Sequence, residues 1–320
     1  VNDSIVKSVK YRPLRSPSKS PYLKEVYNIA KKDKNVLSLV SDNGMIVYDD
    51  FRRDLPNQYF NFGISEGHMI TAAAGMASCG KIPFAYTIGS FLAYRSYEFI
   101  RLDVCLQKLN VKIVGIGAGV TYGYLGPTHH STEDIAVLRC LPNLTLLSPA
   151  TPKEARTLVQ YAYELNGPVY IRLGNNLPKE LYEEEMEVIP GKASVVRKGK
   201  DIAVFATGEI LYEVMEAADR LMEKGIDTEV ISVHTLKPFD KEFVIETAKR
   251  YSRIYSVEEH SIHGGLGGMI AEVLTEQGIG TRLIRIGMED TFAKGYGTRK
   301  QVLAANKLDA NGILEKIVNS

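Results

Sequence analysis

The 320-residue chain has no tryptophan, only three cysteines and almost no net charge. Its 39 basic and 38 acidic side chains leave a formal charge of +1, which gives no electrostatic reason to expect nucleic acid or an anionic membrane as a partner. No apolar run is long enough to cross a bilayer, and residues 1–13 lack the apolar segment of a secretory signal. These absences predict a soluble cytoplasmic protein.

The cysteines are too few and too scattered to form a structural framework. Cys79, Cys105 and Cys140 stand singly within apolar patterns, and no CxxC spacing occurs. We therefore expect reduced core residues and neither disulfides nor a metal site made by this chain.

A regular alternation of apolar runs and amphipathic stretches fills most of the chain. After a polar arm (1–19), six strand-like runs alternate with helical patterns over residues 20–176. Residues 177–191 hold an acidic cluster and two prolines, as is typical of a linker. A second alternation occupies residues 192–320. The prediction is an α/β protein of two doubly wound domains with mostly parallel sheets.

Two glycine-rich segments superficially resemble nucleotide-binding loops. The first, GIGAGVTYG at 115–123, is followed by more loop instead of the helix that a dinucleotide fingerprint requires. The second, HGGLGG at 263–268, opens a helix but has no acidic residue at the required distance. We interpret both as tight packing between elements.

Glu66 stands at an unusual place, where the apolar run 59–65 gives way to a helix rich in alanine. Both flanks have the composition of a protein core, so the carboxylate is expected to be at least partly buried. Taken alone, the residue has a simpler explanation. An acidic side chain at a helix N-terminus is stabilised by about 0.3–1 kcal/mol through the helix dipole.

Two further groups lie near the predicted carboxyl ends of strands. Phe91, Tyr94 and Tyr97 follow one another at intervals of three, which fits one face of a helix and suits either core packing or a flat wall for an aromatic ring. His129 and His130 lie in the loop GPTHH, at the sheet edge where ligands of open α/β folds bind.

These pieces, in this order, resemble a known family. FNFGISEGHMITAAAGMA, GSFLAYRSYEFIR, GPTHHSTEDIAVLRCLPNLTLLSPA and VEEHSIHGGLGG are similar to the pyrimidine-binding and C-terminal domains of transketolases, and to the same region of 1-deoxyxylulose-5-phosphate synthases. The resemblance runs from about residue 22 to 318. The family's diphosphate-binding domain, whose GDG…N motif holds a divalent metal, has no counterpart. The resemblance thus implies one subunit of a split transketolase, with Mg²⁺ or Ca²⁺ held by a partner chain.

The resemblance also assigns roles to individual residues. Glu66 would be the catalytic glutamate that hydrogen-bonds the aminopyrimidine of thiamine diphosphate, because a carboxyl shielded from water can share a proton with a ring nitrogen. Asp42 would contact the cofactor, and His129 would touch substrate oxygens. The aromatic pocket around the pyrimidine would consist of Phe91, Tyr94 and Tyr97.

Several substrate positions depart from the family pattern. Leu125 replaces an aspartate that reads a sugar hydroxyl, Gly117 replaces a histidine, and Gly174 replaces a phosphate-binding arginine. Lys19 replaces an early arginine; it keeps the positive charge but cannot make the bidentate hydrogen bonds of a guanidinium. Loss of these polar groups predicts ketol transfer between sugars with altered specificity.

Two alternatives remain open at this stage. The reaction could be a pyruvate-decarboxylating synthesis of the deoxyxylulose-phosphate type, or the chain could be a non-catalytic partner. The expected assembly is a heterotetramer in which this chain associates with itself and with the diphosphate-binding subunit. The arginines at 95 and 172 are nearby cations without an assigned ligand.

Overall fold

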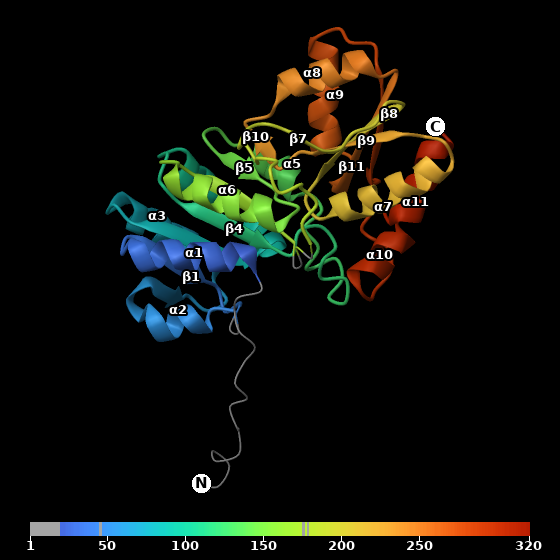
Figure 1. Cartoon of the computed structure of the whole chain (residues 1–320). Coiled ribbons are helices and arrows are strands. Elements are labelled where there is room, and N and C mark those ends of the chain that lie inside the picture. The colour runs from blue at the N-terminus through green and yellow to red at the C-terminus, as the bar shows by residue number, and fades with distance from the viewer. Residues whose placement is uncertain (1–19, 45–46, 175–176, 178) are drawn as a thin grey trace, which may run out of the picture.

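The computed structural model describes residues 20–320 except 45–46, 175–176 and 178 (Figure 1). The N-terminal arm, including the predicted substrate contact Lys19, lies outside the described residues. Two sheets organise the remainder, one of seven strands and one of five, and each has helices on both faces. The predicted fold class, two α/β domains, is confirmed.

The larger sheet has the strand order β10-β5-β6-β4-β3-β1-β2, and all its neighbouring strands are parallel except β10 with β5. Helices α1 and α6 pack together over one face, while α3 and the η3–η4 segment cover the other. The bounds of its strands are β1 Val36–Val40, β2 Tyr59–Asn61, β3 Ile82–Ile88, β4 Lys112–Ile116, β5 Thr145–Leu147, β6 Val169–Leu173 and β10 Thr235–Lys237.

The helical segments of this unit follow local sequence signals. Ser20 and Thr151 cap α1 and α6 with their hydroxyl oxygens, and a proline stands at the first position of each helix, where its missing N–H costs nothing. The bounds are α1 Pro21–Lys32, α2 Asp49–Asp54, η2 Pro56–Gln58, α3 Glu66–Ser78, η3 Phe91–Arg95, α4 Tyr97–Phe99, η4 Ile100–Cys105, α5 Asp134–Arg139 and α6 Pro152–Glu164.

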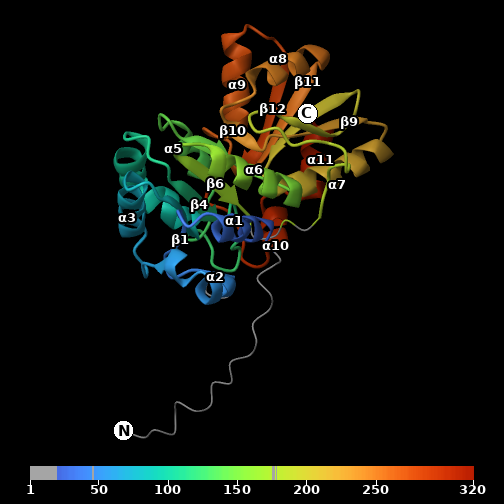
Figure 2. The ribbon, with the colours of Figure 1, turned by 60° about the vertical axis from the view of Figure 1, so that its left-hand side comes forward.

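The smaller sheet has the order β12-β11-β8-β9-β7, with only β7 antiparallel to its neighbour. The α8–α9 pair covers one face and the α7–α11 pair the other, as Figures 1 and 2 show. The bounds are β7 Ser194–Arg197, β8 Ile202–Thr207, α7 Ile210–Glu223, β9 Thr228–Ser232, α8 Lys241–Arg250, β11 Arg253–Ser261, α9 Leu266–Glu276, β12 Arg282–Met288, α10 Arg299–Ala305 and α11 Ala310–Val318.

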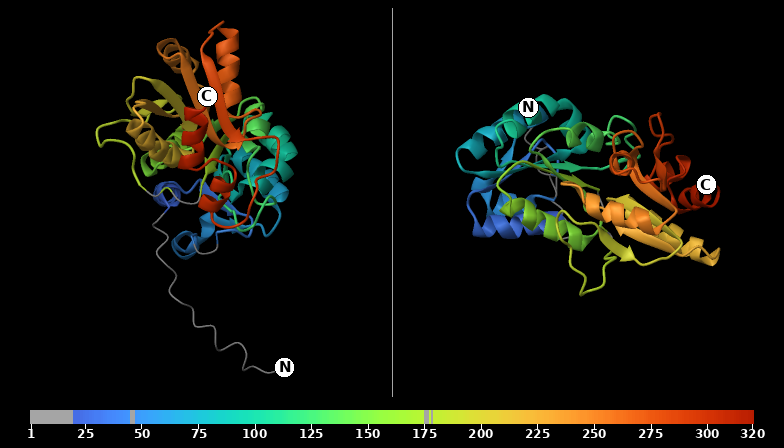
Figure 3. Two further views of the ribbon diagram at one scale, coloured as in Figure 1. Left: turned by 90° about the vertical axis from the view of Figure 1, so that its right-hand side faces the viewer. Right: turned by 90° about the horizontal axis from the view of Figure 1, so that it is seen from above.

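The two units share structure across their boundary and lie side by side when seen from above (Figure 3). Strand β10 follows β9 of the smaller sheet but pairs with β5 at the edge of the larger one. One buried apolar cluster also runs from α3 and η4 into α8 and α9. This crossing was not predicted, because pairing between residues some ninety positions apart leaves no local pattern.

Three local predictions are wrong. Strand β2 ends at Asn61 instead of continuing to 65, since Gly63 has φ +67° and Ile64 is 77% exposed. The run before Glu66 is therefore not core. Of the cysteines only Cys105 is buried, whereas Cys79 and Cys140 are exposed free thiols.

No helix within the described ranges is long and apolar enough to span a membrane. The same residues contain no group of three or more His, Cys, Asp or Glu side chains arranged to hold a metal ion.

Candidate active site

Glu66 is the first residue of α3 and only 2% of it is exposed. Its Oε2 accepts a hydrogen bond from Nη1 of Arg95 at 2.8 Å, within an ion pair whose arginine side chain is 57% exposed. The glycine that follows lets the chain pack closely, because a side-chain carbon at Gly67 would lie 2.7 Å from the ring of Phe99. The carboxylate is buried, as predicted. It is buried at the start of α3 beside Arg95, and not by a preceding apolar strand.

Arg95 also lies over the face of Phe91, with its guanidinium carbon 5.1 Å from the ring centroid. Both residues belong to η3, a π-helical turn in which hydrogen bonds run from residue i to i+5. Such turns are rare and often mark functional sites. The buried carboxylate and the phenyl face together form a cradle for a planar group that donates an N–H, and the guanidinium fills it here.

The π-helical turn separates the three aromatic residues that were expected on one face. Phe91 and Tyr94 line a pocket of about 490 Å³, whereas Tyr97 points its hydroxyl toward Cys140 Sγ, 3.5 Å away. Asp42 is exposed in a left-handed turn with φ +47°, and its backbone N–H donates to Asn61 Oδ1 at 3.0 Å. Neither Tyr97 nor Asp42 is among the residues that line the pocket.

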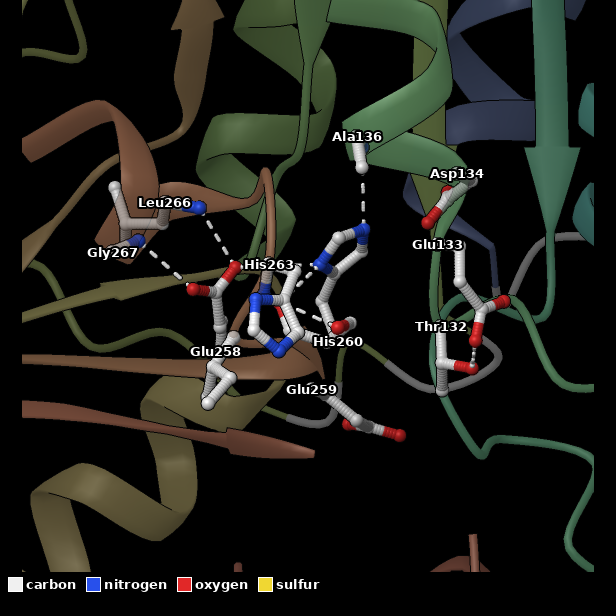
Figure 4. Close-up of polar contacts among 12 residues, drawn as sticks. Thr132, Glu133, Asp134, Ala136, Glu258, Glu259, His260, His263, Leu266 and Gly267 are labelled. Atoms are coloured by element: carbon white, nitrogen blue, oxygen red, sulfur yellow. Dashed lines mark hydrogen bonds and ion pairs between the residues drawn. The ribbon is translucent and has the colours of Figure 1, made fainter. Parts of the chain in front are cut away.

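Tyr94 is fixed by a residue far from it in the sequence. Its hydroxyl donates to Glu133 Oε2 at 2.8 Å, and the Glu133 backbone N–H donates back to the same hydroxyl oxygen at 3.0 Å. Thr132 Oγ1 donates to the other carboxylate oxygen at 2.7 Å (Figure 4). Burial, assisted by the nearby carboxylates of Asp134 and Glu133, raises the pKa of Tyr94, so the phenol stays protonated.

The loop between β4 and α5 carries the histidine pair. His129 packs edge-on against Phe91, with 5.0 Å between ring centroids, and its Nδ1 lies 2.9 Å from Thr128 Oγ1. His130 is buried and forms part of the pocket wall. The predicted substrate residue His129 thus adjoins the pocket, while the histidine that lines it is His130.

At the two glycines that replace substrate-binding residues, the space beside the backbone is occupied by side chains from other positions. A side chain at Gly117 would overlap the ring of Tyr122, and one at Gly174 would overlap the Glu209 carboxylate. The loop residue Leu125 is 52% exposed. The space that a longer side chain would need at 117 and 174 is therefore occupied in this fold.

Arg172 has a structural position and is only 2% exposed. Its Nε donates to both oxygens of Asp134 at 2.9 and 3.1 Å, and its Nη2 donates to the carbonyls of Ser131 and Glu259 at 3.0 and 3.1 Å. Burial alone would lower the pKa of Arg172, but the neighbouring Asp134 carboxylate outweighs it and raises that pKa, so the guanidinium stays charged. The ion pair joins β6 to the start of α5, and the bond from Nη2 to the Glu259 carbonyl links both to the second unit.

The segment VEEHS has a similar linking role (Figure 4). Glu258 accepts the backbone N–H groups of Leu266 and Gly267, at 2.7 and 2.8 Å, and so caps α9. Glu259 accepts the N–H of Val120 at 2.7 Å and pairs with Arg299. The glycine cluster that follows is therefore helix capping and close packing, as predicted.

Sequence reasoning missed the positions of Glu133, Tyr122 and Glu209. The partners of Glu133 and Glu209, which are Tyr94 and Gly174, lie far away along the chain. Tyr122 lies only a few residues after Gly117, but no local motif signals that its ring folds back onto that glycine. The pairing of the half-exposed Arg95 with the buried Glu66 was also unforeseen.

Comparison with known proteins adds independent evidence. The transketolase pyrimidine-binding domain model matches residues 24–181, and the transketolase C-terminal domain model matches residues 191–313. One subunit of the apulose-4-phosphate transketolase from Actinobacillus succinogenes is 39% identical over 83% of this chain and 85% of its own length. 1-Deoxy-D-xylulose-5-phosphate synthase 1 of Geobacter metallireducens is 36% identical over 91% of this chain, but over only 47% of its own length.

A solved structure described as a split gene transketolase, an inactive β4 tetramer, superposes with a TM-score of 0.85. It is 34% identical in sequence, and the match covers 94% of this chain and 96% of that one.

Proposed function

Because the chain belongs to the transketolase family, we propose that it is the subunit of a split transketolase that contributes Glu66 to a thiamine diphosphate site. The cofactor, when bound, supplies the electron sink for carbon–carbon bond cleavage. A second chain would provide the diphosphate-binding residues and the divalent metal. The relative that is named as one transketolase subunit and the tetrameric split-gene neighbour support self-association together with a partner chain.

The observation that carries this proposal is the cradle formed by Glu66 and Phe91. An aminopyrimidine is planar and, when protonated on its ring, donates an N–H, as the Arg95 guanidinium does in the same place. The residues present therefore fit the cofactor. Glu66 would hold a proton at the ring nitrogen, and Phe91 would set the plane of the ring. Tyr94 would close one side while its own hydroxyl stays on Glu133.

We further propose that the substrate is not the usual pentose-phosphate pair. Leu125 cannot hydrogen-bond a sugar hydroxyl. Tyr122 and Glu209 occupy the space that side chains at 117 and 174 would take. A carboxylate at the latter place disfavours a distal phosphate there. The relative named for apulose 4-phosphate makes that compound the first donor to assay.

Reconstitution with a diphosphate-binding chain tests the function. We expect thiamine diphosphate to bind the assembled pair more tightly than either chain alone, with ketol transfer from apulose 4-phosphate and little from xylulose 5-phosphate. Robust turnover of xylulose 5-phosphate with ribose 5-phosphate would remove the altered-substrate proposal. Absence of transfer with every ketose would remove the function itself.

One competing activity has specific support, since a deoxyxylulose-phosphate synthase matches the same region. That reaction releases carbon dioxide from pyruvate, whereas ketol transfer does not. Carboxyl-labelled pyruvate therefore separates them: label released as carbon dioxide by the assembled pair would favour the synthase.

A further inference from the structure

The β4–α5 loop (residues 119–131) is closed at its base by a short antiparallel pairing. Gly119 and Ser131 exchange two backbone hydrogen bonds of 3.0 and 2.8 Å. Only one residue separates Ser131 from His129, whose ring packs edge-on against Phe91 with 5.0 Å between centroids. The base of the loop is therefore close in the chain to the contact with the cradle, and a shift of the base displaces that contact.

The second unit binds the base of this loop through Glu259, near the end of β11. Glu259 Oε1 accepts the backbone N–H of Val120 at 2.7 Å. A Cβ on Gly119 would lie 2.3 Å from Cγ of Glu259, so the lack of a side chain at 119 lets the glutamate lie against the loop backbone. On the other side of the base, Arg172 Nη2 donates both to the Ser131 carbonyl at 3.0 Å and to the Glu259 carbonyl at 3.1 Å.

An apolar anchor accompanies these polar contacts. The side chain of Val120 is fully buried and belongs to a core cluster that consists almost entirely of second-unit residues, among them Val257 and Ile286. Farther along the loop, a Cβ on Gly123 would lie 2.5 Å from the carbonyl oxygen of Gly297 in the second unit. The loop thus belongs to the first unit in sequence but is packed against the second.

The carboxylate of Glu259 is itself held in place. Its Oε2 accepts a hydrogen bond from Nε of Arg299, in α10, at 2.9 Å. The same guanidinium lies 4.0 Å from the Glu209 carboxylate and 3.8 Å from that of Glu213. Because its two oxygens have different partners, Glu259 connects α10 to the base of the loop, and charge-assisted bonds of this kind fix direction well.

The neighbouring carboxylate of β11 bonds elsewhere. Glu258 is also buried, and it accepts the backbone N–H groups of Leu266 and Gly267 at the start of α9 (Figure 4). The two glutamates therefore match in burial and in the kind of hydrogen bond that they accept, but only Glu259 bonds the loop. Glu258 is the natural control for the loss of a buried carboxylate.

We propose that the second unit is the template that sets the position of the β4–α5 loop, with Glu259 as the positioning residue. The inference rests on the proposed function, in which His129 contacts the substrate and Phe91 sets the plane of the cofactor ring. Glu259 itself is not among the residues that line the pocket. It acts through the loop base, and so gives the C-terminal unit a part in activity.

Hydrogen exchange of the full chain tests this coupling without turnover. In Glu259→Ala, the amides of residues 119–131 should exchange at least about tenfold faster than in wild type, because the buried bond to Val120 is lost. In Glu258→Ala, faster exchange should be confined to residues 266–276. Equal loop exchange in Glu259→Ala and wild type, or equal acceleration of the loop in both alanine variants, would overturn the inference.

Two milder variants keep the test valid if Glu259→Ala does not fold. Glu259→Gln keeps an acceptor oxygen for the Val120 N–H, so its loop exchange should stay within about threefold of wild type. Val120→Ala keeps the bond to Glu259 and shortens only the apolar anchor, so it should accelerate loop exchange by about threefold or more. Loop exchange in Val120→Ala that equals wild type would contradict the template role of the second unit.

Steady-state kinetics of the reconstituted pair test the consequence for the site. Glu259→Ala should raise KM for the ketose donor at least about fivefold, because His129 is displaced, whereas Glu258→Ala should stay within about twofold of wild type. Glu259→Gln should recover most of the loss. An equal rise in KM in both alanine variants would leave Glu259 with a structural role only and overturn its assignment as a positioning residue.

The two measurements separate this inference from the proposed function. Faster loop exchange in Glu259→Ala alone, with no ketol transfer by the wild-type pair, would leave the coupling standing while the proposed function fails. Unchanged loop exchange in a pair that transfers ketol groups would overturn the coupling alone.

Discussion

At the scale of single residues, Arg95 makes with Glu66 and Phe91 the two contacts that a protonated heteroaromatic ring would make in its place. The arginine is more than half exposed, so its ion pair is screened by solvent and contributes little stability. It can therefore leave at small cost when a better-fitting ring enters.

Arg95→Ala should strengthen thiamine diphosphate binding to the reconstituted pair. The ring would no longer displace a guanidinium, and the gain is bounded by the worth of an exposed ion pair, up to about fivefold in Kd. Calorimetric titration measures this, with Arg101→Ala, an exposed arginine in η4, as the control. Weaker binding in Arg95→Ala would instead mean that Arg95 contacts the bound ligand.

Gly117 allows a second test at the residue scale. Gly117→Ala places a Cβ on the ring of Tyr122 at φ +84°, so we expect a loss of about 1–3 kcal/mol in the free energy of unfolding. Gly75→Ala, in the interior of α3 with nothing within 4 Å, should instead stabilise by about 0.5–1 kcal/mol. Urea unfolding compares the two, and equal effects would refute the claim that Tyr122 fills the space at 117.

At the scale of elements, the buried ion pair of Arg172 and Asp134 connects β6 to the start of α5. Arg172→Met leaves Asp134 charged, buried and without its cation, which should cost about 3–5 kcal/mol of unfolding free energy. The double variant Arg172→Met, Asp134→Leu removes both charges and should recover part of that loss. Denaturant unfolding provides the measurement, and a double variant as unstable as the single one would contradict this assignment.

The sequence predicts most elements of this fold because buried parallel strands are continuous apolar runs, as in β1, β3 and β6. It fails where geometry depends on distant partners. The π-helical turn η3 has no local signature, yet it directs Tyr97 away from Phe91 and Tyr94. Likewise, the Tyr94–Glu133 bond joins residues 39 positions apart and appears only in three dimensions.

At the scale of the whole molecule, Lys112 gives the folded state a pH dependence. It is fully buried at the start of β4, with its Nζ donating to the carbonyls of Leu165 and Gly167, and burial lowers its pKa to about 7. Above that pH the folded chain holds Lys112 neutral, whereas the unfolded chain keeps it charged up to about 10.5. The unfolded state thus binds more protons, and stability rises with pH.

We expect the free energy of unfolding to increase from pH 7 to about 9 in wild type and to be flatter in Lys112→Met. The upper limit arises because burial raises the pKa of Cys105 to about 12, which favours the unfolded state once its free thiol ionises near pH 9. Urea titrations at several pH values measure the slope. A flat wild-type profile, or an equal slope in the variant, would contradict the assignment.

The whole molecule presents its cofactor cradle as an incomplete site. Glu66 and Phe91 supply one wall, and the guanidinium that occupies the cradle is open to solvent. In the described residues no cluster could hold the metal that a diphosphate would need. The proposed function places the diphosphate and metal ligands on a second chain.

Turnover by Glu66→Ala in the reconstituted complex is the decisive measurement for the cofactor role of this chain. We predict that ketol transfer falls by at least about a thousandfold, because no carboxylate remains to hydrogen-bond the protonated ring nitrogen. The complex should assemble as in wild type. Glu98→Ala, an exposed glutamate in α4, should retain full activity. Activity that survives in Glu66→Ala, with assembly intact, would contradict the role of Glu66 and the mechanism built on it.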